Sequence, residues 1–191
     1  MIISKLILTD CDGVLLDWAA QFDAWALNMK GLKLIRTDVY DLSGRYDVSK
    51  EYSKQLSREF NNSSAAGFIP PFRDAVEYVA LMHYTYGYKF RVITSFSKDP
   101  WSIQMRKENL RRYFGDAIES LVSLDTGADK DEELAPYADQ KLYWIEDKPS
   151  NATTGYNLGL KSLLIEHDHN ANENVPYPIV KSWKEIFDIV V

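Results

Sequence analysis

Residues 6–14 read Leu-Ile-Leu-Thr-Asp-Cys-Asp-Gly-Val, an apolar run that ends in two acids and a glycine. The apolar run begins near residue 2, and continuous runs of this kind are typical of buried strands in parallel sheets. Asp10 and Asp12 are two positions apart, so their side chains point to the same side of the chain as it leaves the strand. Two carboxylates that face one point repel each other unless a cation or a proton lies between them. The stretch therefore predicts a strand followed by an acidic site that suits Mg²⁺, or a pair in which one acid attacks and the other moves protons.

The composition predicts one globular domain. The 191 residues are 46% hydrophobic and 26% charged, which is ordinary for such a domain and sufficient for a buried core. The single cysteine excludes an internal disulfide framework, and the net charge of −6 argues against a nucleic-acid polymer as partner. No apolar run is long enough to span a membrane, and the N-terminus lacks the layout of a signal peptide. We therefore expect a soluble cytoplasmic protein without a membrane partner, and a homodimer is one option for its oligomeric state.

Strand-like and helix-like segments alternate along the chain after Pro70-Pro71. The expected strands cover residues 88–94, 118–124, 141–146 and 161–166, the expected helices cover 73–84, 100–113 and 149–159, and residues 183–190 form a last helix or strand. Earlier in the chain, a helix over 15–30 follows the acidic turn, and loops and short helices fill 31–68, including a helix over about 49–61. This alternation predicts an α/β fold with a parallel sheet covered on both faces.

Polar side chains follow several of the expected strands. In open parallel sheets, ligands bind where the strands end at their carboxyl side. The groups expected there are Asp10 and Asp12 after the first strand, Thr94 and Ser95 after the second, Glu146 and Asp147 at the end of 141–146, and Lys130 ahead of that strand. Carboxylates of this kind hold a metal ion, and hydroxyl and ammonium groups hold the oxygens of a phosphate.

With these motifs, the chain resembles the haloacid dehalogenase-like hydrolases. Four signatures of that superfamily follow one another here: Asp-Cys-Asp-Gly-Val at 10–14, Val-Ile-Thr-Ser at 92–95, Lys130, and Ile-Glu-Asp at 145–147. The resemblance implies a three-layer, Rossmann-like core of residues 1–16 and 69–191. It also implies a small helical cap of residues 17–68, inserted after the first strand, that closes over the active site and excludes water.

The resemblance also implies a role for each signature residue. Asp10 would be the nucleophile that takes the phosphoryl group as an aspartyl-phosphate, and Asp12 would protonate the leaving alkoxide and later activate water. Thr94 would hydrogen-bond a phosphate oxygen, and Lys130 would neutralise phosphate charge and orient Asp10. Mg²⁺ would be held by Asp10, the backbone carbonyl of Asp12 and Asp147, with Glu146 as a further ligand that binds directly or through water.

A narrower resemblance is to the 5′(3′)-deoxyribonucleotidase branch of the superfamily. It is carried by residues 10–18, 69–76 and 182–186 and by the pair Thr94-Ser95. It implies Mg²⁺-dependent hydrolysis of nucleoside monophosphates, with Trp18 stacked on the base. Ser95 and a basic residue about a dozen positions later, Lys107 or Arg106, would bind the phosphate.

Two other functions stay open from the sequence. One is a phosphatase for another small metabolite, such as a sugar phosphate. The other is a regulatory module that binds a nucleotide or phosphate without turnover, although pure binding has no need of a nucleophile.

Structural alternatives also stand beside the expected site residues. Thr94 and Ser95 are suited to capping the following helix, and Lys130 lies in an acidic run, residues 129–133, that suits a solvated surface. Trp18 and Phe22 are four residues apart and suit one packed helix face. Cys11 is expected to point into the core, and residues 167–169 are expected to form an exposed loop.

Overall fold

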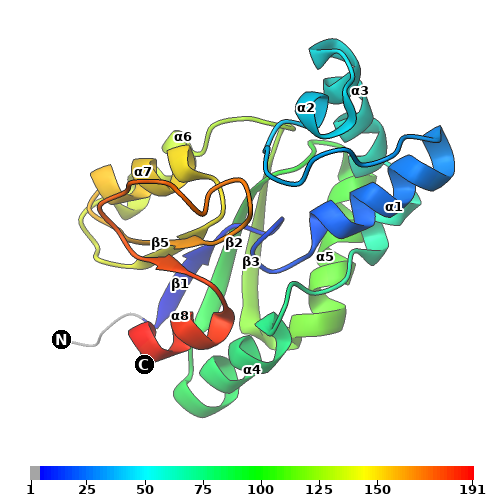
Figure 1. Cartoon of the computed structure of the whole chain (residues 1–191). Helices are drawn as coiled ribbons and strands as arrows, with labels where there is room; N and C mark the ends of the chain where they lie inside the picture. Colours follow the sequence, from blue (N-terminus) through cyan, green and yellow to red (C-terminus); the bar gives the residue numbers. More distant parts are fainter. Residues whose placement is uncertain (1–4) are drawn as a thin grey trace.

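A six-stranded parallel sheet forms the centre of the molecule in the computed structural model, which describes residues 5–191 (Figure 1). Its strand order is β3-β2-β1-β4-β5-β6, and every pair of neighbours is parallel. The strands are β1 (Leu6–Thr9), β2 (Lys89–Ser95), β3 (Ile118–Leu124), β4 (Tyr143–Glu146), β5 (Lys161–Ile165) and β6 (Ile179–Val180). The expected α/β fold with a parallel sheet is confirmed, and residues 2–4 of the expected first strand lie outside the described residues.

The helices also follow the expected order. They are α1 (Trp18–Lys30), α2 (Leu42–Tyr46), α3 (Lys50–Asn61), α4 (Ala75–Tyr86), α5 (Pro100–Phe114), α6 (Asp131–Leu134), α7 (Pro149–Asn157) and α8 (Trp183–Val190). The last segment is a helix, and the hydroxyl of Ser182 caps it by accepting a hydrogen bond from the Glu185 amide. The two-residue strand β6 and the single turn α6 were not expected, because elements this short carry no periodicity.

Helix α1 begins at Trp18 rather than at residue 15. The amides of Leu15 and Leu16 both donate to the Cys11 carbonyl, so the chain first closes a tight turn around the acidic stretch. The Asp17 side chain then accepts from the Ala20 amide and starts the helix. The apolar residues before Asp17 therefore belong to the turn and the core, although their spacing suits a helix.

Alternate residues of the strands face opposite sides of the sheet, as the pleat requires. Ile7 and Ile145 belong to one buried cluster, whereas their neighbours Leu8 and Trp144 belong to a second. Helices α4, α5 and α8 contribute to the first cluster, whereas α7 packs on β4 and β5 and contacts α6. Each large apolar side chain buried in this way stabilises the fold by about 1.5–3 kcal/mol. The molecule therefore has the expected three layers.

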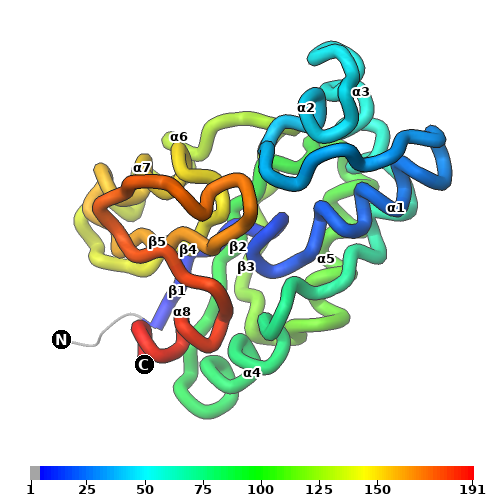
Figure 2. The backbone as a smooth tube through the Cα atoms, in the orientation of Figure 1, coloured from blue at the N-terminus to red at the C-terminus, as the bar shows by residue number. Residues whose placement is uncertain are grey.

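Every strand that the structure describes lies outside residues 17–68, the segment that is expected to form the cap. Helices α1, α2 and α3 gather at one end of the molecule, and Figure 2 traces the chain from β1 through the acidic turn into α1. The segment enters and leaves the core at one place, because the Asp17 amide donates to the Pro70 carbonyl and the Phe72 amide donates to the Leu15 carbonyl. The division into core and cap stays a prediction.

Candidate active site

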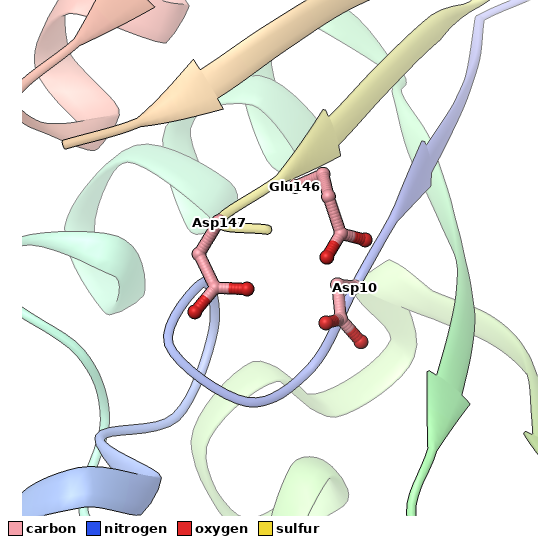
Figure 3. Close-up of side chains that lie close together, drawn as sticks. All are labelled: Asp10, Glu146 and Asp147. Carbon is pink, nitrogen blue, oxygen red and sulfur yellow. The ribbon is translucent and has the colours of Figure 1, made fainter. Parts of the chain in front are cut away.

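Three buried carboxylates meet at the carboxyl ends of β1 and β4. Asp10 follows β1, Glu146 ends β4 and Asp147 comes next, and the two strands are hydrogen-bonded neighbours. One oxygen from each carboxylate lies within 4.8 Å of the others. Figure 3 shows the three side chains turned toward a common space. The parallel sheet therefore brings together acids that are more than 130 positions apart in the sequence.

Lys130 lies between two of these acids. Its Nζ is 2.9 Å from Asp10 Oδ1 and 2.8 Å from Glu146 Oε2, and only 1% of the side chain is exposed. The charges of Asp10 and Glu146 raise the pKa of Lys130 even though burial, the largest influence, lowers it. Lys130 is therefore a buried counter-ion of the acid cluster and is not part of a solvated surface, whereas its neighbour Asp129 is exposed.

The acids outnumber this cation, and their pKa values reflect the excess charge. Burial, followed by the charge of Asp10, raises the pKa of Glu146 to about 7. Burial and the charge of Glu146 raise the pKa of Asp147 well above its usual value. Three carboxylates against one ammonium group make a set of hard oxygen donors with net negative charge, which fits a divalent cation such as Mg²⁺.

Asp12 lies at the same turn and pairs with a buried arginine. Nη1 of Arg106 donates to Asp12 Oδ1 and lies 3.0 Å from the Sγ of Cys11, while the guanidinium stands 4.0 Å above the ring centre of Phe96. The Asp12 side chain keeps 22% of its surface exposed, so it stays reachable from solvent. Burial raises the pKa of Asp12, and the charge of Arg106 opposes that shift.

Cys11 points into the core as the sequence predicts, and it is fully buried. Burial raises the pKa of its thiol to about 12. The neutral thiol is a small packed group and not a nucleophile.

Thr94 and Ser95 end β2, next to β1, but their hydroxyl groups differ. Thr94 is buried, and its hydroxyl forms no hydrogen bond with any residue that the structure describes. Ser95 Oγ donates to the Ala128 carbonyl at 2.6 Å, which fixes the loop that carries Lys130. The Ser95 hydroxyl thus supports the loop before Lys130 in this structure, and its contact with a phosphate stays a prediction.

Lys107, which was expected to contact phosphate, is exposed on α5, whereas its neighbour Arg106 is buried beside the acids. The Lys107 side chain lines a surface hollow with Gly115 and Ile118, which lie at the amino end of β3 and not at the carboxyl ends of the strands. Successive residues of a helix point about 100° apart, so only one of two adjacent residues faces the site. Arg106 is that residue.

Trp18 contacts other cap residues. Its ring stacks on Phe22 with 4.6 Å between ring centres, meets the edge of Phe60, and donates through Nε1 to Asn61 Oδ1 at 2.9 Å. These contacts are those of a packed helix face, and stacking of Trp18 on a base stays a prediction.

The sequence did not indicate three residues near the acids: Tyr40, His167 and His169. His167 Nε2 lies 2.8 Å from the Gly13 carbonyl and 4.0 Å from Asp147 Oδ2, so residues 167–169 are not simply an exposed loop. The signal for His167 was present, because it follows the end of β5 by two residues at the same edge of the sheet.

Gly13 is the residue that lets Asp147 approach the acidic turn. Its φ is +73°, and a Cβ atom there would lie 2.3 Å from Asp147 Oδ2. Only glycine accommodates both the left-handed backbone and this contact.

Several solved structures superimpose on this chain over nearly its whole length. A hydrolase of the haloacid dehalogenase-like family from Streptococcus pneumoniae superimposes with a TM-score of 0.68 at 14% identity, over 100% of both chains. A protein from Haemophilus somnus 129pt described as a predicted phosphoglycolate phosphatase gives 0.63 at 15% identity over 100% of both chains. CbbY from Rhodobacter sphaeroides, solved with phosphate, gives 0.61 at 15% identity over 96% of each chain.

The fold is that of the haloacid dehalogenase-like hydrolases. No family model and no curated protein matches the chain. Among residues 5–191, no helix combines the length and the apolar character needed to cross a membrane.

Proposed function

We propose that this protein is a phosphomonoesterase that hydrolyses a small phosphorylated metabolite through an aspartyl-phosphate on Asp10. The observation that supports this most is the arrangement of Asp10. Its Oδ1 accepts from the Cys11 amide at 2.6 Å and lies 2.9 Å from Lys130 Nζ. The carboxylate is thereby fixed, and its other oxygen is left for attack on phosphorus.

Asp12 is suited to move the protons of this reaction. When Asp10 attacks phosphorus, the bond between phosphorus and the leaving oxygen breaks, and Asp12 gives its proton to that oxygen. Water then attacks the phosphorus of the aspartyl-phosphate, Asp12 takes a proton from the water, and Asp10 leaves as a carboxylate. The raised pKa of Asp12 supports its first role, because the acid must hold a proton before the leaving group departs.

A divalent cation fits the acid cluster and would neutralise charge on the phosphoryl group. Asp10, Asp147 and the Asp12 carbonyl would hold it. Glu146 is less suited as a direct ligand, because both of its oxygens already accept. Oε2 accepts from Lys130, and Oε1 accepts from the Lys148 amide at 3.2 Å and from Asn151 Nδ2 at 3.3 Å. We propose that Glu146 instead holds Lys130 against Asp10.

The substrate is better described as a small metabolite than as a nucleotide. One of the similar structures is described as a predicted phosphoglycolate phosphatase. One face of Trp18, the residue expected to stack on a base, is covered by Phe22. Hydrolysis of nucleoside monophosphates remains the second candidate, supported by the sequence likeness to deoxyribonucleotidases.

A screen of phosphorylated compounds with Mg²⁺ tests the proposal. We expect release of phosphate from sugar or other small-metabolite phosphates, and we expect Asp10→Asn to lower kcat by at least about 10³-fold. Asp188→Asn is the matched control, because Asp188 is an exposed acid on α8. Near-parental turnover by Asp10→Asn would refute the covalent mechanism, and nucleotides as the best substrates would establish the second candidate.

A further inference from the structure

A segment of the cap region reaches the acid cluster through Tyr40. This residue lies in the connection between α1 and α2, and its ring centre is 5.1 Å from that of His169, with the rings inclined at 68°. Tyr40 nevertheless keeps 55% of its surface exposed. It therefore borders open space and does not fill the core.

His169 continues a row of stacked rings toward the acids. Its ring lies parallel to that of His167 at 5.3 Å, and His167 stacks on Phe72 at 4.9 Å. His167 in turn lies 4.0 Å from Asp147 Oδ2. We call Tyr40, His169, His167 and Phe72 the ring wall; it extends from the cap region to the side of Asp147.

The polar atoms of the ring wall are uncharged. An imidazole is mostly neutral at pH 7, because its ordinary pKa is about 6.5. Burial of the hydroxyl end of Tyr40, followed by the charge of Asp147, raises the pKa of this phenol well above its usual value. Tyr40 is therefore a neutral donor at pH 7, and the charges of Asp147, Glu146, Asp10 and Asp12 all act on its hydroxyl.

His169 also has an unused polar atom. Its Nε2 is buried and has no hydrogen-bond partner among the residues that the structure describes. A buried polar atom without a partner costs free energy, so such an atom beside an active site indicates a group that a ligand satisfies. His167 is different, because its Nε2 already lies 2.8 Å from the Gly13 carbonyl.

The charges near the ring wall argue against a carboxylate ligand. The two arginines whose charges act on these imidazoles already have partners, and the guanidinium of Arg73 lies 4.4 Å from the ring centre of Phe72. Arg45 pairs with Asp23 at 3.1 Å, and Arg73 donates to the backbone carbonyls of Glu166 and Lys181. A carboxylate beside Tyr40 and His169 would thus compete with the existing partners of Arg45 and Arg73 and would meet the repulsion of the acid cluster.

We propose that Tyr40 and His169 form the subsite for the leaving group and that this group is an uncharged, hydroxyl-bearing chain, as in a sugar or polyol phosphate. The inference rests on the proposed function and names its substrate class. A hydroxyl group both donates and accepts, which matches a phenol and a neutral imidazole. The two residues are specificity determinants and take no part in the transfer of the phosphoryl group.

Two ring-preserving variants, Tyr40→Phe and His169→Phe, test this assignment. The measurement is kcat/KM for ribose 5-phosphate and glycerol 3-phosphate, divided by kcat/KM for phenyl phosphate, which lacks hydroxyl groups. We expect this ratio to fall about threefold to tenfold in each variant, mainly through KM, because each loses one neutral hydrogen bond. Tyr84→Phe is the control, because Tyr84 is 75% exposed on α4, and it should leave the ratio unchanged.

The outcomes separate the two proposals. An active enzyme whose ratio is unchanged in both variants refutes the subsite and leaves the phosphomonoesterase proposal standing. A parental preference for phosphoglycolate over both hydroxyl-bearing substrates also refutes the subsite. If the parental protein with Mg²⁺ hydrolyses no phosphomonoester, the proposed function fails, and the subsite fails with it.

Discussion

Replacing Lys130 by methionine should destabilise the protein most strongly in alkaline solution. The side chain is 1% exposed and contacts Asp10 and Glu146 at 2.9 and 2.8 Å, so its removal leaves two buried carboxylates without their counter-ion. Removing one partner of a buried ion pair costs about 3–5 kcal/mol of the free energy of unfolding. Methionine keeps most of the apolar volume of the lysine stem, so the loss reports the missing charge.

The sign of the pH dependence follows from Glu146. Its pKa is raised to about 7 in the folded parental protein, above the value of about 4.3 in an unfolded chain. Without Lys130, whose charge lowers that pKa, the pKa rises further. The folded variant therefore binds a proton more tightly than the unfolded chain does, so its deficit is full at pH values above the folded pKa. Relative to the parental protein, the deficit shrinks as the pH falls from the folded pKa of the variant to about 7, because below that pH Glu146 is protonated in both folded proteins.

Urea unfolding between pH 5 and pH 9, without divalent cations, measures this deficit. Lys184→Met is the control, because Lys184 pairs with Asp188 on the exposed surface of α8 and should show no pH-dependent loss. A loss below about 1 kcal/mol at pH 9, well short of the range for a broken buried pair, would refute the assignment of Lys130 as counter-ion. A loss that does not change with pH would refute the electrostatic reasoning.

Three further predictions concern the cation, the turn and the general acid. Mg²⁺ should raise the Tm of the parental protein by mass action, and chelation of Mg²⁺ should abolish turnover. Asp147→Asn should remove most of this shift in Tm. Equal shifts in the parental protein and in Asp147→Asn would exclude Asp147 as a ligand. Gly13→Ala should cost about 1–3 kcal/mol or more and most of the activity, because its Cβ meets Asp147 Oδ2 at 2.3 Å. Gly127 has a similar φ of +78° but open space around it, so Gly127→Ala should lose less stability than Gly13→Ala in urea unfolding. Equal losses in the two variants would show that backbone strain alone is responsible. Arg106→Met should move the alkaline limb of the pH profile of kcat/KM to higher pH, because the charge that lowers the pKa of Asp12 is gone. Arg106→Lys keeps this charge and should leave the limb in place. An alkaline limb that does not move, or that moves to lower pH, in Arg106→Met would contradict the pairing of Arg106 with Asp12.

Much of the fold was predictable because its determinants are local. The run before Asp10 and the alternation after Pro70 indicated a parallel sheet, and the carboxyl-end rule then placed Glu146 and Asp147 beside Asp10. The sheet itself enforces this convergence, because β1 and β4 are neighbours. A rule about strand ends therefore succeeds wherever the functional residue directly follows a strand.

The residues that the sequence did not place depend on tertiary position. Whether Arg106 or Lys107 faces the acids depends on the rotation of α5 about its axis. Two neighbouring residues in the sequence do not define this rotation. Tyr40 lies in a connection without periodicity, and only the packing of the cap region brings it to His169. The sequence indicates no hydrogen-bond partner for the Ser95 hydroxyl, because its partner, the Ala128 carbonyl, is 33 positions away and is brought near only by the fold.

Mass spectrometry of the peptide that contains residue 10 detects the aspartyl-phosphate itself. With 4-nitrophenyl phosphate, whose leaving group needs no proton from Asp12, the Asp12→Asn variant should still form the aspartyl-phosphate but should hydrolyse it slowly. We therefore expect one added phosphoryl group on Asp10 after incubation with this substrate and Mg²⁺. The Asp10→Asn variant should show none. An unmodified peptide in an Asp12→Asn protein that continues to release phosphate would contradict the account, because turnover would then proceed without Asp10 as nucleophile.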